Sequence, residues 1–229
     1  PAVHLANDGA EPETFTIERA TWSDDALRAG ALLGMQEFRD LFSEEYLGAD
    51  VKLAIGEQTV LFTDVVGSTA FYAACGDPGA FVEIKKHFDE LFAIVRANHG
   101  AIVKTIGDAI MATFVSPLDA LRAARAIHGA FSPARTDTPI RVRISLNTGA
   151  CIAVRLNSNI DFFGGTVNVA AKLQALAEGY QIAMSDATYR AAGVAEYLAE
   201  QKAELVDLTY ESKALREPVS VKQWSVYRD

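Results

Sequence analysis

Two aspartates, each next to a β-like run, are the residues of this sequence best suited to chemistry. The first, Asp64, follows the β-rich run 59–63 and precedes a small-residue turn that leads into a helix. A carboxylate there can hold a hard cation, because Mg²⁺ and related ions prefer oxygen ligands. The main-chain N–H groups of Gly67, Ser68 and Thr69, at the turn and helix start, favour the anionic oxygens of a phosphate. The alternative is that Asp64 only caps the helix.

The second aspartate, Asp108, belongs to the dipeptide Gly107-Asp108 between two β-like runs, 101–106 and 109–115, which predicts a tight hairpin. If this hairpin pairs with the Asp64 strand in one sheet, the two carboxylates meet at one end of the sheet. Two carboxylates can hold two divalent ions, one activating an attacking hydroxyl and the other neutralising leaving phosphates. Gly-Asp alone is a common turn, so the inference depends on the pair.

A further pair of polar residues lies on the helix predicted after Gly165. Asn168 and Lys172 are four positions apart, so both side chains project from one face of that helix. Apolar residues supply a neighbouring face that anchors it: Val169, Leu173 and Leu176. Taken alone, Lys172 would be a solvated surface lysine.

The composition limits the class of protein. The chain has 229 residues, 50% of them hydrophobic, which suits one large domain with an appendage. A net charge of -9, with acids and bases mixed along the chain, disfavours nucleic-acid binding, which requires a basic face. No apolar run reaches the roughly 20 residues of a membrane span, and no secretory signal follows Pro1. Cys75 and Cys151 lack metal-binding spacing, so we expect reduced thiols in a cytoplasmic protein.

The first 52 residues are predicted to form an N-terminal segment distinct from the rest. Two short strands, 3–5 and 15–17, flank a turn at Asn7-Asp8-Gly9, and a helix follows from Ser23. This helix carries a narrow stripe of small and apolar residues: Leu27, Ala31, Gly34, Phe38 and Leu41. Such a stripe fits either a dimer seam or packing on the chain's own domain, and two heptads are too few to decide.

The remaining residues, 53–229, alternate between strand and helix patterns. Asp77 caps a helix that begins at Pro78 and ends at Gly100, with this apolar face: Phe81, Ile84, Phe88, Leu91 and Val95. Further elements are predicted as helix 118–131, strand 140–147, strand 151–156 paired with it, helix 166–178, and strands 181–184, 203–207 and 219–226. We expect an α/β (α+β) sandwich, with a mixed, largely antiparallel sheet and helices on one face. The other face would be exposed or meet a partner.

Three segments taken together resemble a known family. FTDVVGST, KTIGDAIMATF and DFFGGTVNVAAKL, in this order, resemble the catalytic domain of class III nucleotidyl cyclases from about residue 53 to the C-terminus. The earlier EFRDLFSEEYL resembles the connector before that domain in multidomain bacterial cyclases, which implies an upstream regulatory domain. The resemblance implies a ferredoxin-like, palm-like core and a head-to-tail homodimer with shared sites.

The resemblance also implies roles for individual residues. Asp64, Asp108 and the carbonyl of Val65 match the ligands of two divalent cations, Mg²⁺ or Mn²⁺. Lys104 and Asp161 match the pair that binds the purine. Asn168 matches the residue that orients the ribose. Lys172 stands at a position where the family usually has arginine, and Lys213 matches a lysine near the terminal phosphates.

The purine-binding pair favours ATP over GTP. The Watson–Crick edge of adenine offers an amino donor and a ring-nitrogen acceptor, which aspartate and lysine complement, whereas guanine presents the reverse. The expected activity is therefore that of an adenylyl cyclase, which forms 3′,5′-cyclic AMP and pyrophosphate by in-line attack of the ribose 3′-hydroxyl on the α-phosphorus. Two alternatives stay open, a guanylyl cyclase and a catalytically weak regulatory module. Lys172 and Ala150, where some members carry arginine, favour the latter.

Overall fold

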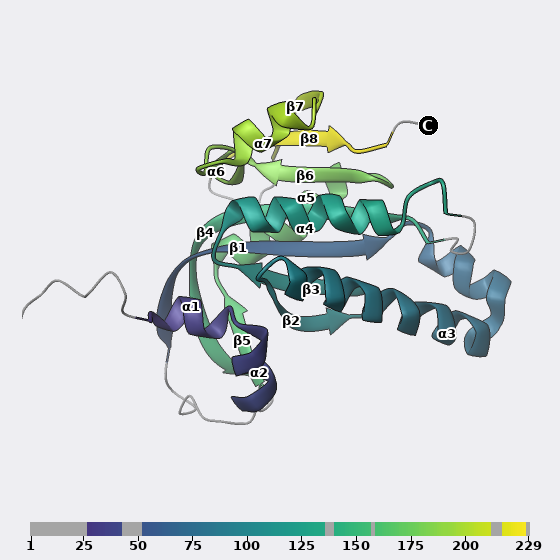
Figure 1. Ribbon diagram of the computed structural model, residues 1–229, viewed down its shortest axis with the longest axis horizontal. Coiled ribbons are helices and arrows are strands. Elements are labelled where there is room, and N and C mark those ends of the chain that lie inside the picture. Colours follow the sequence, from purple (N-terminus) through teal and green to yellow (C-terminus); the bar gives the residue numbers. More distant parts are fainter. Residues whose placement is uncertain (1–26, 43–51, 136–139, 157–158, 212–216, 228–229) are drawn as a thin grey trace, which may run out of the picture.

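The computed structural model describes residues 27–42, 52–135, 140–156, 159–211 and 217–227. An open, eight-stranded sheet forms its centre (Figure 1), in the order β2-β3-β1-β4-β6-β8-β7, with β5 paired to β4 alone. Among the strand pairs of these described ranges, β4 and β6 run parallel and the others are antiparallel. The strands are β1 Leu53–Val65, β2 Ala101–Ile106, β3 Ala109–Phe114, β4 Val142–Leu156, β5 Asn159–Phe163, β6 Gln181–Ser185, β7 Leu205–Tyr210 and β8 Val219–Ser225.

Helices pack on both faces of this sheet. They are α1 Ala29–Leu33, α2 Gln36–Phe42, α3 Ser68–Ala97, α4 Pro117–Ala130, α5 Gly165–Leu173, the 3₁₀ turn η1 Gln174–Leu176, α6 Asp186–Tyr189 and α7 Val194–Glu200. The long helices α3 and α4 share one apolar cluster with the sheet. On the opposite face α1 and α5 pack around Val60 and Phe62 of β1. Because both faces are covered there, β1 is buried without interruption from Gln58 to Thr63.

The predicted fold class, α/β with a mixed, largely antiparallel sheet, is confirmed, but the helices were predicted on one face only and instead cover both. The hairpin 101–106/109–114 and the final strands form as expected. One prediction is wrong, because 140–147 and 151–156 are not two paired strands but parts of the single strand β4. Asn147-Thr148-Gly149 does not turn, since Thr148 pairs with Thr59 of β1 and its hydroxyl lies 2.9 Å from that of Thr59. The second half of β4 pairs instead with β5.

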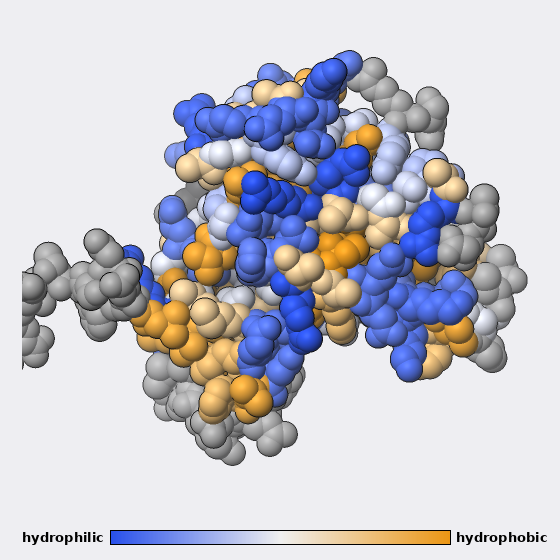
Figure 2. Space-filling view, in the orientation of Figure 1, coloured by the Kyte–Doolittle hydropathy of each residue, from blue (hydrophilic) through white to orange (hydrophobic). Residues whose placement is uncertain are grey.

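The N-terminal helix also differs from the prediction. It is divided at Gly34 into the short helices α1 and α2. Leu27 and Leu41 are 58% and 76% exposed, so the predicted stripe is not one buried face. Leu33 is the residue of α1 that enters the core beside β1. Hydrophobic side chains gather on the surface over α1 and α2 at the lower left of Figure 2, and Phe42 stacks there on Phe38. The predicted strands 3–5 and 15–17 lie outside the described residues.

Helix α3 combines the helix predicted after the turn at Gly67 with the helix predicted from Pro78. A first segment starts at Ser68, and Gly76 interrupts it with φ 68° and ψ 157°, before the longer part predicted from Pro78. Its early turns project beyond the end of the sheet (Figure 1). Phe81, expected on the apolar face, is therefore 69% exposed, whereas Leu91 and Val95 are fully buried.

Candidate active site

The strand register brings the two candidate metal-binding aspartates to one end of the sheet. Asp64 is the penultimate residue of β1, and Asp108 lies in the turn between β2 and β3. β1 and β3 are antiparallel, with Phe62 opposite Met111. Near the turn, the hydroxyl of Thr63 accepts a hydrogen bond of 3.1 Å from the main-chain nitrogen of Ile110. The arrangement that the sequence predicted for the two acids is thus present in the structure.

An arginine that the sequence did not single out faces Asp64. Arg143 stands directly opposite it on β4. Its Nε and Nη2 both donate to Oδ2 of Asp64, the first over 2.8 Å. Because both bonds end on one oxygen, neither of them occupies Oδ1. Arg143 alternates with the apolar residues Val142 and Ile144 along its strand, but only the β1–β4 register shows which acid it meets.

One oxygen of the Asp108 carboxylate, Oδ2, is buried and has no hydrogen-bond partner within the part of the chain that the structure describes. Leaving a buried anionic oxygen without a partner costs folding free energy. A divalent cation bound to this oxygen would supply the partner. No cluster of three or more His, Cys, Asp or Glu side chains suited to a metal occurs among the described residues. An ion held by these two carboxylates would therefore complete its coordination with phosphate and main-chain oxygens.

The surroundings of the acids agree with this use. Val65 ends β1 and offers its carbonyl next to Asp64. Gly67 follows with φ 74°, and no side chain caps the first N–H groups of α3, at Ser68 and Thr69. Below the hairpin turn, His87 is 1% exposed, and burial lowers its pKa to about 4, an effect that the main chain of Asp108 partly opposes. The His87 imidazole is thus neutral next to the main chain of Asp108.

The two predicted purine-binding residues contact each other. Nζ of Lys104 on β2 lies 2.5 Å from Oδ2 of Asp161 on β5. Oδ1 of Asp161 accepts a second bond, 2.8 Å long, from the main-chain nitrogen of Phe162. The lysine side chain is 40% exposed and the aspartate 12%. A donor and an acceptor from different strands therefore stand together at an accessible edge.

The other predicted residues lie elsewhere. α5 is held on the sheet by Ser145, which donates to the carbonyl of Ala170 over 2.7 Å. Asn168 is exposed on this helix and Lys172 half-buried. Within the described ranges, no hydrogen bond or ion pair joins either one to the two aspartates or to the Lys104–Asp161 pair. Ala150 is exposed on β4, and Lys213 lies outside the described residues.

Solved structures define the class of fold. The adenylyl cyclase CyaB from P. aeruginosa superimposes with a TM-score of 0.61 at 21% identity, over 78% of this chain and 97% of that one. The catalytic core of a rhodopsin-guanylyl cyclase with converted specificity gives a TM-score of 0.65 at 23% identity, over 77% and 98%. The fold is therefore that of class III cyclase catalytic domains.

Sequence comparison establishes the family. Residues 52–209 match the model of the adenylate and guanylate cyclase catalytic domain, and the chain belongs to this family. The putative adenylate cyclase 3 of Rhizobium meliloti is 32% identical over 134 residues, 58% of this chain and 22% of that protein. Retinal guanylyl cyclase 1 of Mus musculus is 30% identical over 153 residues, 58% of this chain and 13% of that protein. The chain thus spans less than a quarter of either relative's length. None of the helices in the described ranges is long and apolar enough to cross a membrane.

Proposed function

We propose that the chain is the catalytic domain of an adenylyl cyclase, which converts ATP to 3′,5′-cyclic AMP and pyrophosphate. The observation that carries this proposal is the contact of Lys104 with Asp161, 2.5 Å apart at the edge of a cyclase-family domain. An aspartate oxygen can accept a hydrogen bond from the amino group of adenine, and a lysine can donate one to a ring nitrogen. Guanine has a carbonyl and an N–H at these places, so this pair supports ATP.

Asp64, Asp108 and the carbonyl of Val65 would hold two divalent cations, Mg²⁺ or Mn²⁺. Such ions acidify a hydroxyl and neutralise phosphate charge when they are bound. The N–H groups of Ser68 and Thr69 bind phosphate oxygens at the start of α3. With the triphosphate held there, the 3′-oxygen forms a bond to the α-phosphorus, the bond to the β-phosphate oxygen breaks, and the hydroxyl proton leaves to solvent. Catalysis is then mostly positioning and charge stabilisation.

Two further residues act from α5. Asn168 orients the ribose by hydrogen bonding, and Lys172 brings a positive charge toward the α-phosphoryl group as negative charge develops there. Both side chains share one face of the helix, four residues apart. Gly67 gives the turn its positive φ, and Lys213 is the proposed contact of the terminal phosphates.

We propose that the sites are shared across a head-to-tail homodimer. Exposure of Asn168 supports this arrangement, because a residue that completes a site on a second copy must be accessible in one chain. One chain would supply the two aspartates, and its partner would supply Asn168 with the purine-binding pair. The dimer then contains two equivalent sites. A regulatory domain upstream and a location in the cytoplasm, where ATP and Mg²⁺ are available, belong to the same proposal.

An assay with both nucleotides tests the proposed function. Purified protein is incubated with ATP or GTP and with Mg²⁺ or Mn²⁺, and the cyclic products are separated by chromatography. We expect metal-dependent formation of cyclic AMP, and a double variant, Lys104→Glu with Asp161→Cys, should lower ATP use and relax the discrimination against GTP. Faster formation of cyclic GMP by the parent would establish the guanylyl alternative. Nucleotide binding without turnover under any metal would show a regulatory module.

A further inference from the structure

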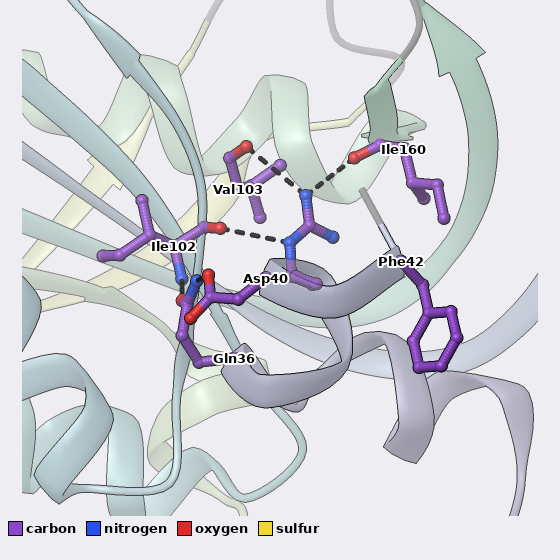
Figure 3. Close-up of a pocket in the computed structure, with 7 residues that line it drawn as sticks. Gln36, Asp40, Phe42, Ile102, Val103 and Ile160 are labelled. Carbon is purple, nitrogen blue, oxygen red and sulfur yellow. Dashed lines mark hydrogen bonds between the residues drawn. The ribbon is translucent and has the colours of Figure 1, made fainter. Parts of the chain in front are cut away.

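A half-buried arginine from the N-terminal segment binds the main chain beside the purine-binding pair. Nε of Arg39, on α2, donates to the carbonyl of Ile102 over 3.1 Å. Its Nη2 donates to the carbonyls of Val103, over 3.3 Å, and Ile160, over 2.7 Å. The dashed lines in Figure 3 show these carbonyls facing one guanidinium from two separate strands. The guanidinium also lies over the ring of Phe162, 5.6 Å from its centre.

These bonds span a place where the sheet itself makes no connection. β2 pairs with β3, and β5 pairs with β4, so no ladder of main-chain hydrogen bonds joins β2 to β5 in the described residues. Across this gap the structure has two polar links, the Lys104–Asp161 contact and Arg39. Val103 immediately precedes Lys104, and Ile160 immediately precedes Asp161. Arg39 therefore binds the main chain one residue before each member of the pair.

The chemistry of the arginine suits a fixed spacing. A guanidinium is planar and presents several N–H donors at set angles, whereas a lysine is a point charge on a flexible stem. Burial lowers the pKa of Arg39, and the negative charges of Asp161 and Asp40 oppose that shift. Nη1 is buried without a partner among the described residues. A partly desolvated guanidinium held mainly by carbonyls is a costly way to anchor a helix, which indicates that the position of Arg39 near the Lys104–Asp161 pair matters.

The helix that carries Arg39 docks through one face. Gln36 accepts a hydrogen bond of 2.7 Å from the main-chain nitrogen of Ile102 on β2. Asp40 pairs over 2.8 Å with Arg96 of α3. These residues and Arg39 lie within five positions of α2, so a displacement of this helix from β2 breaks all of these contacts together.

We propose that Arg39 is a positioning residue that sets the spacing of the two purine-binding strands, so that docking of α2 controls the affinity for the base. This inference rests on the proposed purine role of Lys104 and Asp161. It gives the segment before the catalytic domain a physical route to the substrate site. A change that pulls α2 away loosens the pair without altering either member, and α2 makes no hydrogen bond or ion pair with Asp64 or Asp108 among the described residues.

Variants of Arg39 and a matched control test the proposal. Arg39→Met removes all three carbonyl contacts. Arg39→Lys keeps the charge but loses the planar guanidinium with its N–H donors at set angles. Arg96→Met is the control, because it removes another arginine that touches α2, by an exposed ion pair with Asp40 that does not reach β5. Hydrogen exchange of segments 101–106 and 159–163 is measured without nucleotide or metal. KM and kcat for ATP, the ATP/GTP ratio and equilibrium binding of ATP are measured with Mn²⁺.

For Arg39→Met we expect exchange in 159–163 to become about 10-fold faster and KM for ATP to rise about 10-fold, with kcat within about two-fold of the parent. The ATP/GTP preference should fall. Arg39→Lys should give intermediate values, and it preserves the test should Arg39→Met not fold. Arg96→Met should stay within about two-fold of the parent throughout.

Two results would overturn the proposal. One is exchange in 159–163 that is equally slow in the Arg39 variants and in Arg96→Met. The other is faster exchange with unchanged KM, ATP binding and ATP/GTP preference, which would limit Arg39 to a structural role. A parent protein that turns over no nucleotide would refute the proposed function instead, because the exchange and binding measurements do not depend on turnover.

Discussion

The ion pair between Arg143 and Asp64 predicts how tightly the first metal ion binds. Replacing Arg143 by methionine keeps a long side chain on β4 and removes the positive charge that lies against the carboxylate. The guanidinium makes both of its bonds to one oxygen of Asp64, so a cation bound at the same carboxylate must share it with a like charge. We therefore expect Arg143→Met to bind Mn²⁺ more tightly than the parent.

Coulomb's law gives the size of the effect. A single charge and a divalent ion about 5 Å apart repel by about 1.7 kcal/mol at the dielectric constant of water and by about 7 kcal/mol at an effective value of 20. Arg143 and Asp64 are 35% and 25% exposed, so solvent screens the pair and the lower figure applies. This corresponds to at least about a 10-fold decrease in the Kd for Mn²⁺. In the metal-free protein the lost ion pair should cost about 1 kcal/mol of stability or less.

The assay separates these two effects. Free Mn²⁺ is titrated by electron paramagnetic resonance without nucleotide, and thermal unfolding is followed with a chelator present. Arg122→Met is the control, since it removes the same charge from α4, where Arg122 pairs with Asp119. The control should change the Kd by less than about two-fold. An Arg143→Met protein that binds Mn²⁺ as weakly as the parent, or more weakly, would refute the reasoning and show that Arg143 assists the metal site.

Three other predictions follow from the same structure. Asp64→Ala and Asn168→Ala should each be nearly inactive, but mixed dimers should regain activity, because one of their two sites is intact; heterodimers without activity would contradict shared sites. Lys172→Arg should raise kcat several-fold at unchanged KM for ATP, and Lys172→Ala should lower kcat on the order of 10²-fold. Steady-state kinetics measure both, and an alanine variant as fast as the parent would contradict the prediction. Burial lowers the pKa of His128 to about 4, so the unfolded chain binds more protons below pH 6.5, and stability should fall by on the order of 3 kcal/mol as pH drops from 6.5 to 4. The free energy of unfolding, measured with urea at several pH values, should depend less on pH in His128→Gln than in the parent. An equal pH dependence in the two proteins would argue against the lowered pKa of His128.

Local patterns predicted those parts of the fold that depend on neighbouring residues. Gly107-Asp108 between two apolar runs could only be a short connection, and the hairpin formed there. Both acids were placed correctly because a strand end and a hairpin turn are local features. The division of the 142–156 region failed for a non-local reason. Asn147-Thr148-Gly149 resembles a turn, but β1 is long enough to pair with all of it.

The residues that sequence analysis missed are those whose role depends on register. Arg143 looks like any outward residue of an alternating strand until the β1–β4 pairing sets it opposite Asp64. Arg39 belongs to a segment whose stripe fitted either a dimer seam or packing on the chain's own domain, and its partners are main-chain carbonyls more than 60 positions away. No pattern of side chains marks such acceptors. The proposed shared site likewise depends on a second copy.

The sheet order has a practical consequence for anyone who wishes to produce a smaller protein. The family match ends at residue 209, yet β8, at 219–225, lies between β6 and β7 rather than at the rim. Trimming there would remove β8, the strand that pairs with β7 among the described residues, and uncover the edge of β6, which invites aggregation through unpaired strand edges. Trimming at residue 52 would likewise remove Leu33 from the core and leave three carbonyls without Arg39. A useful recombinant fragment should therefore run at least from residue 27 to residue 227.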